Sequence, residues 1–301
     1  MTDCPLCGGG QRRKLYALQS DEGVDYATVR CLDCGFVHMW PRPTLDYLNR
    51  FYANAPVYAQ PSERPEDYAN AIADKQTMIA GFLKTVPGSP ATGLAVDYGA
   101  GQGATVKALN NMGFDATGIE ISEKARIAAK SLFDVILRDG DISGFQDNSI
   151  ALLTMFDILE HLLEPADFLS LAHTKLAPGG VALIGVPNFD AIDRILTGPK
   201  SKALIFPEHV NQFTRTTLVK ALSDAGFNVC YVGSPPPYGV AITLKLRQNL
   251  LKVFGRNAVT LALRDALVWI KRYLIYPLPN AFVEKSGLFG QSLLILAQKR
   301  A

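Results

Sequence analysis

A glycine-rich turn between an apolar strand and a helix constrains this chain more than any other stretch. Residues 94–106 read L-A-V-D-Y-G-A-G-Q-G-A-T-V, so an apolar run, an acidic residue and three alternating glycines precede a helical start. Gly99, Gly101 and Gly103 have no Cβ, which lets the backbone turn tightly and approach a ligand closely. The pattern predicts a nucleoside-bearing ligand at the N-terminus of the helix.

From residue 93 onward, strand and helix patterns alternate, which is typical of a parallel sheet covered on both faces. We expect strands at residues 94–98, 116–121, 135–137, 150–156, 181–186 and 228–232, and a reversed last strand at 292–297. The second strand ends at Glu120, about twenty residues after the glycine loop, where a carboxylate can accept both hydroxyls of a ribose. The prediction is therefore an α/β fold that binds a cofactor at the carboxyl edge of its sheet.

The glycine loop resembles the first motif of class I S-adenosylmethionine-dependent methyltransferases, in which an acidic residue stands two positions before G-x-G-x-G. Asp97 and the three glycines occupy those positions. With Ala104 last, the same letters also satisfy the dinucleotide pattern G-x-G-x-x-G/A, and Glu120 would serve either cofactor. The loop alone therefore leaves both cofactors open.

Three downstream motifs are similar to the methyltransferases. D-I-L-E-H-L at residues 157–162 follows the fourth strand and resembles a motif of members that act on small molecules. L-A-P-G-G at 176–180 resembles the family's turn before the fifth strand, and P-E-H-V-N-Q-F-T at 207–214 precedes a helix that ends in A-G-F. The resemblance implies a Rossmann-like seven-stranded sheet with a reversed last strand and S-adenosylmethionine as cofactor.

The resemblance also implies roles for residues outside the glycine loop. It places Asp141 and Ile142, in the loop after the third strand, against the adenine, and it places Asp157 at the cofactor site as well. The alternative for the first pair is an ordinary Asp-Gly-Asp turn with no ligand.

Four of the five cysteines form two C-x-x-C-G pairs near the N-terminus. Two such turns supply the four thiolates that a structural Zn²⁺ needs, with no open position for catalysis. We therefore predict a small zinc ribbon over residues 1–40, in which the metal ligands are Cys4, Cys7, Cys31 and Cys34. Cys230 and His38 are left outside the metal site.

Residues 41–90 are predicted to form a Tyr-rich helical cap, including a helix at 68–83, and a linker rich in Pro and Gly. The resemblance implies that Tyr58 belongs to a segment that lies over the active site. The methyltransferase core is expected at 91–301, with a basic, amphipathic helical insertion at about 238–287. This insertion is consistent with a lid, a dimer face or peripheral contact with a membrane surface.

The expected activity is methyl transfer to a small-molecule acceptor, first of all to a hydroxyl of a sugar, a lipid-linked intermediate or a secondary metabolite. A hydroxyl acceptor benefits from a general base, and histidine is suited to that role near neutral pH. His209 is the first candidate and His161 the second, because each follows a Glu at the carboxyl edge of the sheet. Methylation of a sugar carbon remains an alternative.

Two other functions stay open. The ribbon suits RNA binding in an RNA methyltransferase, but the net charge of +2 is mild, and Phe156-Asp157 stands where an Asn/Asp-Pro-Pro-aromatic motif would be. A nucleic-acid partner is therefore not expected.

An inactive scaffold is disfavoured by the intact glycine loop and Glu120. The lack of a charged leader with an apolar run, and of a long apolar run elsewhere, favours a cytoplasmic protein.

Overall fold

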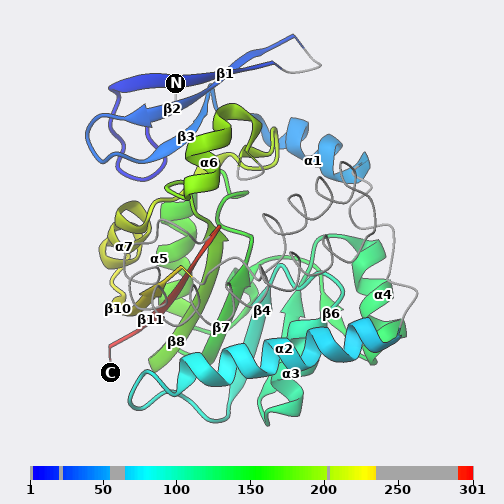
Figure 1. The fold of residues 1–301 in the computed structure, drawn as a ribbon. Helices are drawn as coiled ribbons and strands as arrows, with labels where there is room; N and C mark the ends of the chain where they lie inside the picture. The colour runs from blue at the N-terminus through cyan, green and yellow to red at the C-terminus, as the bar shows by residue number, and fades with distance from the viewer. Residues whose placement is uncertain (1–2, 20–22, 55–64, 202–203, 235–290, 301) are drawn as a thin grey trace, which may run out of the picture.

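A central sheet forms the body of the computed structural model (Figure 1). In spatial order its strands are β10 (Asn228–Gly233), β11 (Ser292–Gln298), β8 (Leu176–Pro187), β7 (Ile150–Phe156), β4 (Leu94–Tyr98), β5 (Asp115–Ile119) and β6 (Leu137–Arg138). The five strands from β8 to β6 run parallel, and β11 runs antiparallel to both of its neighbours. The predicted seven-stranded α/β sheet with a reversed last strand is confirmed.

The structure describes residues 3–19, 23–54, 65–201, 204–234 and 291–300. Tyr58 and the basic insertion predicted at about 238–287 lie outside the described residues. Among the helices that are described, none is both long and apolar enough to cross a bilayer.

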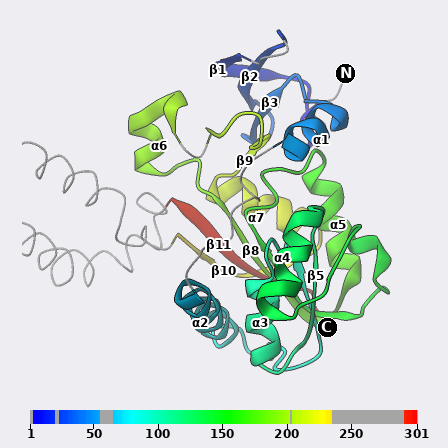
Figure 2. The ribbon, with the colours of Figure 1, turned by 90° about the vertical axis from the view of Figure 1, so that its right-hand side faces the viewer.

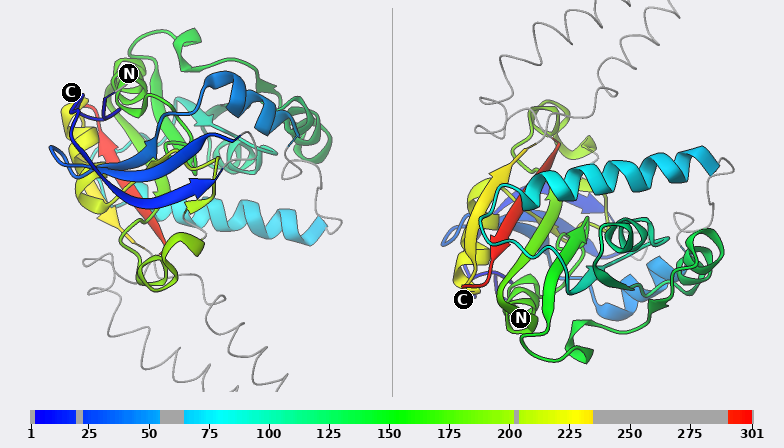
Figure 3. Two further views of the ribbon diagram at one scale, coloured as in Figure 1. Left: turned by 90° about the horizontal axis from the view of Figure 1, so that it is seen from above. Right: turned by 90° about the horizontal axis from the view of Figure 1, so that it is seen from below.

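Helices cover both faces of the central sheet, as the views from above and below show (Figure 3). One face is covered by α2 (Pro65–Leu83), α3 (Ala104–Asn111) and α4 (Glu123–Phe133), and the other by α5 (Pro165–Lys175) and α7 (Arg215–Asp224). Successive residues of a strand point to opposite faces. Leu152 of β7 accordingly packs with Ile79 of α2, whereas Leu153 packs with Leu169 of α5. Burial on both faces explains why β7 is apolar throughout except at Thr154.

A second sheet lies at the N-terminal end of the chain, over the core (Figure 2). It is antiparallel and consists of β1 (Arg12–Gln19), β2 (Asp25–Cys31), β3 (Val37–Trp40) and β9 (Asn211–Gln212). The last of these strands comes from the segment after β8, where Gln212 pairs with Val37 and Asn211 with His38. The predicted ribbon therefore completes its sheet with a strand from the predicted core.

Several elements were not expected from the sequence. These are β1, β3, β9 and helix α6 (Ile192–Thr197), whereas α1 (Leu45–Asn54) lies within the helical cap predicted over residues 41–90. The turn expected at residues 176–180 is instead a wide bulge within β8, because Ile150 pairs with Leu176 and Leu152 with Val181. A Cβ on Gly180 would lie 2.8 Å from the carbonyl oxygen of Ala177, so the bulge requires glycine there.

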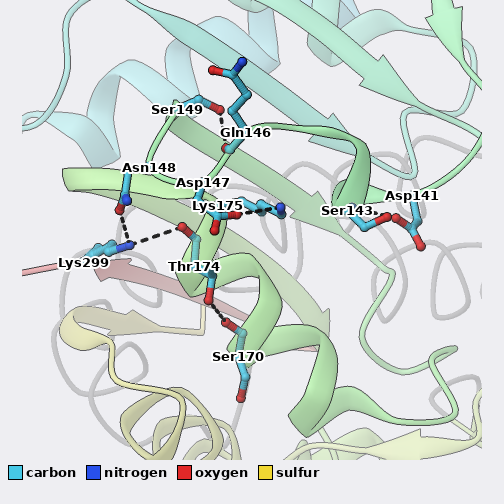
Figure 4. A network of polar contacts seen from close by, with 10 residues as sticks. All are labelled: Asp141, Ser143, Gln146, Asp147, Asn148, Ser149, Ser170, Thr174, Lys175 and Lys299. Carbon is cyan, nitrogen blue, oxygen red and sulfur yellow. Dashed lines mark hydrogen bonds and ion pairs between the residues drawn. The ribbon is translucent and has the colours of Figure 1, made fainter.

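Polar contacts fasten the amino-terminal edge of the parallel strands, opposite the glycine loop (Figure 4). Lys299 Nζ donates to Asn148 Oδ1 at 2.7 Å and to the Thr174 carbonyl at 3.3 Å. Lys175 Nζ forms an ion pair with Asp147 Oδ1 at 2.7 Å. These bonds tie the last strand and the end of α5 to the turn before β7, which leaves the carboxyl edge available for a ligand.

Candidate active site

The glycine loop joins β4 to α3 at the carboxyl edge of the sheet. Gly99, Gly101 and Gly103 have φ values of 78°, 52° and 83°, in the left-handed region that favours glycine. A Cβ on Gly99 would lie 1.9 Å from Ile158 Cδ1. The loop therefore packs directly against the segment that follows β7, and the two predicted motifs form one site.

Glu120 stands beside this loop, just after β5, and is 5 % exposed. The amide of Gly101 donates to its Oε2 and the amide of Ser122 to its Oε1, each at 2.8 Å. A carboxylate offers about four lone-pair sites. Each oxygen of Glu120 thus has one fixed backbone donor and capacity for one more, which suits the two hydroxyls of a ribose.

Asp97 lies beneath the loop and is 3 % exposed. The hydroxyl of Thr154 donates to Asp97 Oδ1 at 2.6 Å, which links β4 to β7. Burial raises the pKa of Asp97 to about 6, and the positive charge of Lys75 on α2 acts in the opposite direction. Asp97 is therefore a buried anchor of the loop rather than a surface carboxylate.

Asp141 and Ile142 follow β6, but their side chains point to different surroundings. Asp141 is exposed, and its Oδ1 accepts the Ser143 amide at 2.6 Å (Figure 4). Ile142 is fully buried in the main core. Only the carboxylate of Asp141 and the backbone of Ile142 are available to a ligand.

The segment after β7 carries Asp157, Glu160 and His161. Asp157 has a φ of 56° and is exposed, and its amide donates to the Gly185 carbonyl at 2.9 Å. Glu160 is only 1 % exposed, and among the described residues neither of its carboxylate oxygens has a hydrogen-bond partner. Burial, followed by the charge of Asp157, raises the pKa of Glu160 well above its usual range. Glu160 was not among the predicted site residues, although an acidic residue directly after the apolar pair Ile158 and Leu159 was a signal for it.

The structure brings the two predicted histidines together. The rings of His161 and His209 meet edge to face with centroids 4.9 Å apart. His161 Nδ1 lies 2.9 Å from the carbonyl oxygen of Glu208, which can only accept, so Nδ1 carries the proton. His161 Nε2 then faces Glu160 Oε1 at 3.9 Å. Burial, followed by the charge of His209, lowers the pKa of His161 to about 4, so this imidazole is neutral at neutral pH.

A buried clasp joins the two segments that carry these side chains. Asn211 Nδ2 donates to the carbonyl oxygens of Leu159 and Leu162 at 3.0 and 2.5 Å. Arg42, which follows β3, donates to Asn211 Oδ1 at 2.9 Å, to the Leu162 carbonyl at 3.2 Å and to the Leu163 carbonyl. Sequence reasoning missed both clasp residues, because the partners are far apart in the chain and only the fold brings them together.

The four predicted cysteine ligands also converge. Cys4 Sγ and Cys34 Sγ are 3.7 Å apart, as are Cys7 Sγ and Cys31 Sγ, and all four sulfurs lie within 4.8 Å of one another. Tetrahedral Zn²⁺ with bonds of about 2.3 Å separates its sulfurs by about 3.8 Å. The glycine after each pair has a φ of 71° or 75°, as these tight turns require. The cluster therefore has the geometry of a closed, structural zinc site.

Comparison with known proteins identifies the family. A family model described as a methyltransferase domain matches residues 72–232, which is more than half of the chain. The chain belongs to this methyltransferase domain family. The matched residues include the glycine loop and Glu120. They also include Glu160, His161 and His209.

Individual relatives of this methyltransferase domain are distant. A protein of Mycolicibacterium smegmatis described as an S-adenosylmethionine-dependent methyltransferase is 26 % identical over 137 residues, 44 % of this chain and 51 % of that protein. A 37.1 kDa protein of transposon TN4556 from Streptomyces fradiae is 29 % identical over 129 residues, 41 % of this chain and 37 % of that protein. The chain thus spans about half or less of the length of these curated relatives.

A solved structure from Galdieria sulphuraria has the same fold. It is described as a sarcosine dimethylglycine methyltransferase, and it superposes with a TM-score of 0.51 at 15 % identity, over 85 % of this chain and 97 % of that one. At this level of identity the likeness concerns the fold alone.

Proposed function

We propose that this methyltransferase domain transfers a methyl group from S-adenosylmethionine to a hydroxyl of a small molecule. The observation that supports the proposal is the close approach of Ile158 to Gly99 of the cofactor loop, because Ile158 stands three residues before His161 in the chain. Bound there, S-adenosylmethionine supplies a methyl group on a positively charged sulfur; an O–CH₃ bond forms, and the electron pair of the broken S–CH₃ bond stays on sulfur.

On the cofactor side, the residues of the chain mainly bind and orient. Glu120 is suited to hold the two ribose hydroxyls, since each of its oxygens is already positioned by one backbone amide. Asp97 keeps the loop in place from below, and Asp141 offers an exposed carboxylate for the amino group of adenine. Asp157 lies at the rim between the loop and the histidines. Such fixed contacts lower the barrier chiefly by positioning.

On the acceptor side, His209 takes the proton of the hydroxyl as it attacks. His161 donates its Nδ1 proton to the Glu208 carbonyl, which fixes its ring against that of His209. The low pKa of His161 makes this imidazole a weak base. The zinc ribbon has a structural part in this proposal: its strand β3 pairs with β9, which follows His209 by one residue.

Turnover and cofactor affinity, measured on the same variants, test the proposal. The acceptor is found by incubating the protein with methyl-labelled S-adenosylmethionine and fractionated cell extract, and identifying the labelled product by mass. His209→Ala is then expected to lower turnover about a hundredfold or more with nearly unchanged cofactor affinity, in line with loss of a general base.

His173→Ala is the matched control, because this histidine lies on α5 with its ring edge against Phe227, away from the site. Full turnover by His209→Ala on the true acceptor contradicts the assignment of the base. Loss of cofactor affinity in parallel with stability indicates instead that His209 only supports its loop.

A further inference from the structure

Three electron-pair donors converge next to the cofactor loop. One donor atom from each of Glu160, His161 and His209 lies within 4.8 Å of the others. Two of them come from the segment after β7, and the third comes from the segment before β9. The clasp made by Arg42 and Asn211 holds these two segments together, so the convergence is built into the fold.

Among the described residues, no hydrogen-bond donor reaches the carboxylate of Glu160 in this cluster. Glu160 is almost completely buried, and neither of its oxygens accepts a hydrogen bond among the described residues. The side chain that faces it is His161, whose proton is held on Nδ1 and whose Nε2 lies 3.9 Å from Glu160 Oε1. A buried carboxylate that accepts no hydrogen bond is unfavourable unless it takes up a proton or binds a cation.

The same hydrogen bond is the one that metal-binding histidines make. A ligating histidine usually donates its second ring N–H to a backbone carbonyl or a carboxylate, which fixes the tautomer and the ring orientation. The Nδ1 of His161 does this toward the carbonyl oxygen of Glu208 at 2.9 Å. A proton between Glu160 and His161 is a poor alternative, since 3.9 Å exceeds hydrogen-bond length.

We propose that Glu160, His161 and His209 form a second metal site, distinct from the cysteine cluster, for a divalent first-row transition ion. One carboxylate and two imidazoles suit Zn²⁺ or Mn²⁺, whereas Mg²⁺ and Ca²⁺ prefer oxygen ligands throughout. Bonds of about 2.0–2.2 Å require the three ligand atoms, which now lie within 4.8 Å of one another, to move closer together when the ion binds.

This inference rests on the proposed function, because it gives the site a way to activate the acceptor. Three protein ligands leave at least one coordination position open, as in catalytic zinc sites. A cation there lowers the pKa of a hydroxyl that binds to it, so the hydroxyl proton leaves to water before methyl transfer. His209 then serves as a ligand rather than as the base, and Glu160 becomes part of the active site.

Manganese binding tests the site without any need for the acceptor. Protein that carries a single equivalent of zinc, which the four thiolates of the cysteine cluster retain, is titrated with Mn²⁺, and free Mn²⁺ is followed by electron paramagnetic resonance. We expect one Mn²⁺ per chain for the wild type and at least tenfold weaker binding for Glu160→Gln and His209→Gln. Glu208→Gln is the matched control: it removes one negative charge next to His209 but no ligand of the trio, and it should bind Mn²⁺ like the wild type.

Thermal unfolding shows whether each variant is folded. Mn²⁺ should raise the Tm of the wild type but not that of folded Glu160→Gln. Absence of Mn²⁺ and Zn²⁺ binding beyond the cysteine cluster, or undiminished binding by both variants, overturns the metal site. Binding of S-adenosylmethionine is measured in parallel on protein that carries zinc at the cysteine cluster only, without added Mn²⁺. If the cofactor binds and the metal does not, only this inference fails and His209 keeps the role of base; if the cofactor does not bind, the proposed function itself fails.

Discussion

Replacing Gly99 by alanine tests how the glycine loop and the segment after β7 fit together. The new Cβ would lie 1.9 Å from Ile158 Cδ1 and 2.6 Å from Ile158 Cγ1, at a φ of 78°. The left-handed conformation costs about 1–2 kcal/mol for a residue with a Cβ, and overpacking costs typically a further 1–3 kcal/mol. We expect Gly99→Ala to lower the free energy of unfolding by about 2–5 kcal/mol, measured by urea denaturation without cofactor.

Gly101→Ala is the matched control, because its φ of 52° is also left-handed but no atom of the described residues lies within 4 Å of the point that its Cβ would occupy. It should cost only the conformational part, about 1–2 kcal/mol. Adding Ile158→Ala to Gly99→Ala removes the overlap, so the double variant should be more stable than the sum of the two single effects predicts, by about 1 kcal/mol or more. Equal losses for the two glycine variants, or strict additivity of the double variant, would refute the proposed packing.

Three further predictions follow from buried charges and thiolates. Purified protein should hold one tightly bound Zn²⁺ on the cysteine cluster, and a variant with Cys31→Ser and Cys34→Ser should lose both this zinc and the ordered ribbon; metal analysis without zinc contradicts this. Arg42→Met removes the donor to the Leu163 carbonyl and to Asn211 Oδ1, so we expect a loss of about 2–4 kcal/mol in urea denaturation, whereas Arg13→Met on the exposed side of β1 should cost little. Asp97 has a native pKa of about 6 against an ordinary 3.8, so its native form keeps a proton that the unfolded chain releases. Stability should therefore fall by about 2 kcal/mol between pH 4 and pH 6, out of about 3 kcal/mol over the whole titration, and this part of the fall should disappear in Asp97→Asn.

The central strands of the sheet were predictable because they are short apolar runs with clear boundaries. β4 and β7 have the predicted bounds, since Leu94–Tyr98 ends at a glycine and Ile150–Phe156 ends at an acidic residue. β1 and β9 were missed for different reasons. β1 (Arg12–Gln19) is polar over much of its length, and β9 has two residues and exists only because β3 lies beside it.

In the candidate site, too, some residues could be predicted from the sequence and others could not. Local motifs pointed to the glycine loop, Glu120 and both histidines, because a tight turn or a strand end demands those residue types. The role of Glu160 depends on its burial, and the clasp of Arg42 and Asn211 joins residues that are 169 positions apart. A short sequence motif predicts neither the burial of a side chain nor a contact between residues far apart in the chain. The burial of Ile142 was likewise hidden, because an apolar residue after Asp141 suits both a ligand contact and the core.

Calorimetric titration with S-adenosylmethionine tests the central claim most directly, namely that the carboxyl edge around the glycine loop and Glu120 binds this cofactor. We expect one molecule per chain, bound more tightly than NAD⁺. Glu120→Gln should weaken binding about tenfold or more, since hydrogen bonds to a charged group contribute roughly 1.5–3 kcal/mol. Glu123→Gln, the same change at an exposed position on α4, should leave the affinity unchanged. Tighter binding of NAD⁺, or equal affinity of the Glu120 variant and the wild type, would contradict the account.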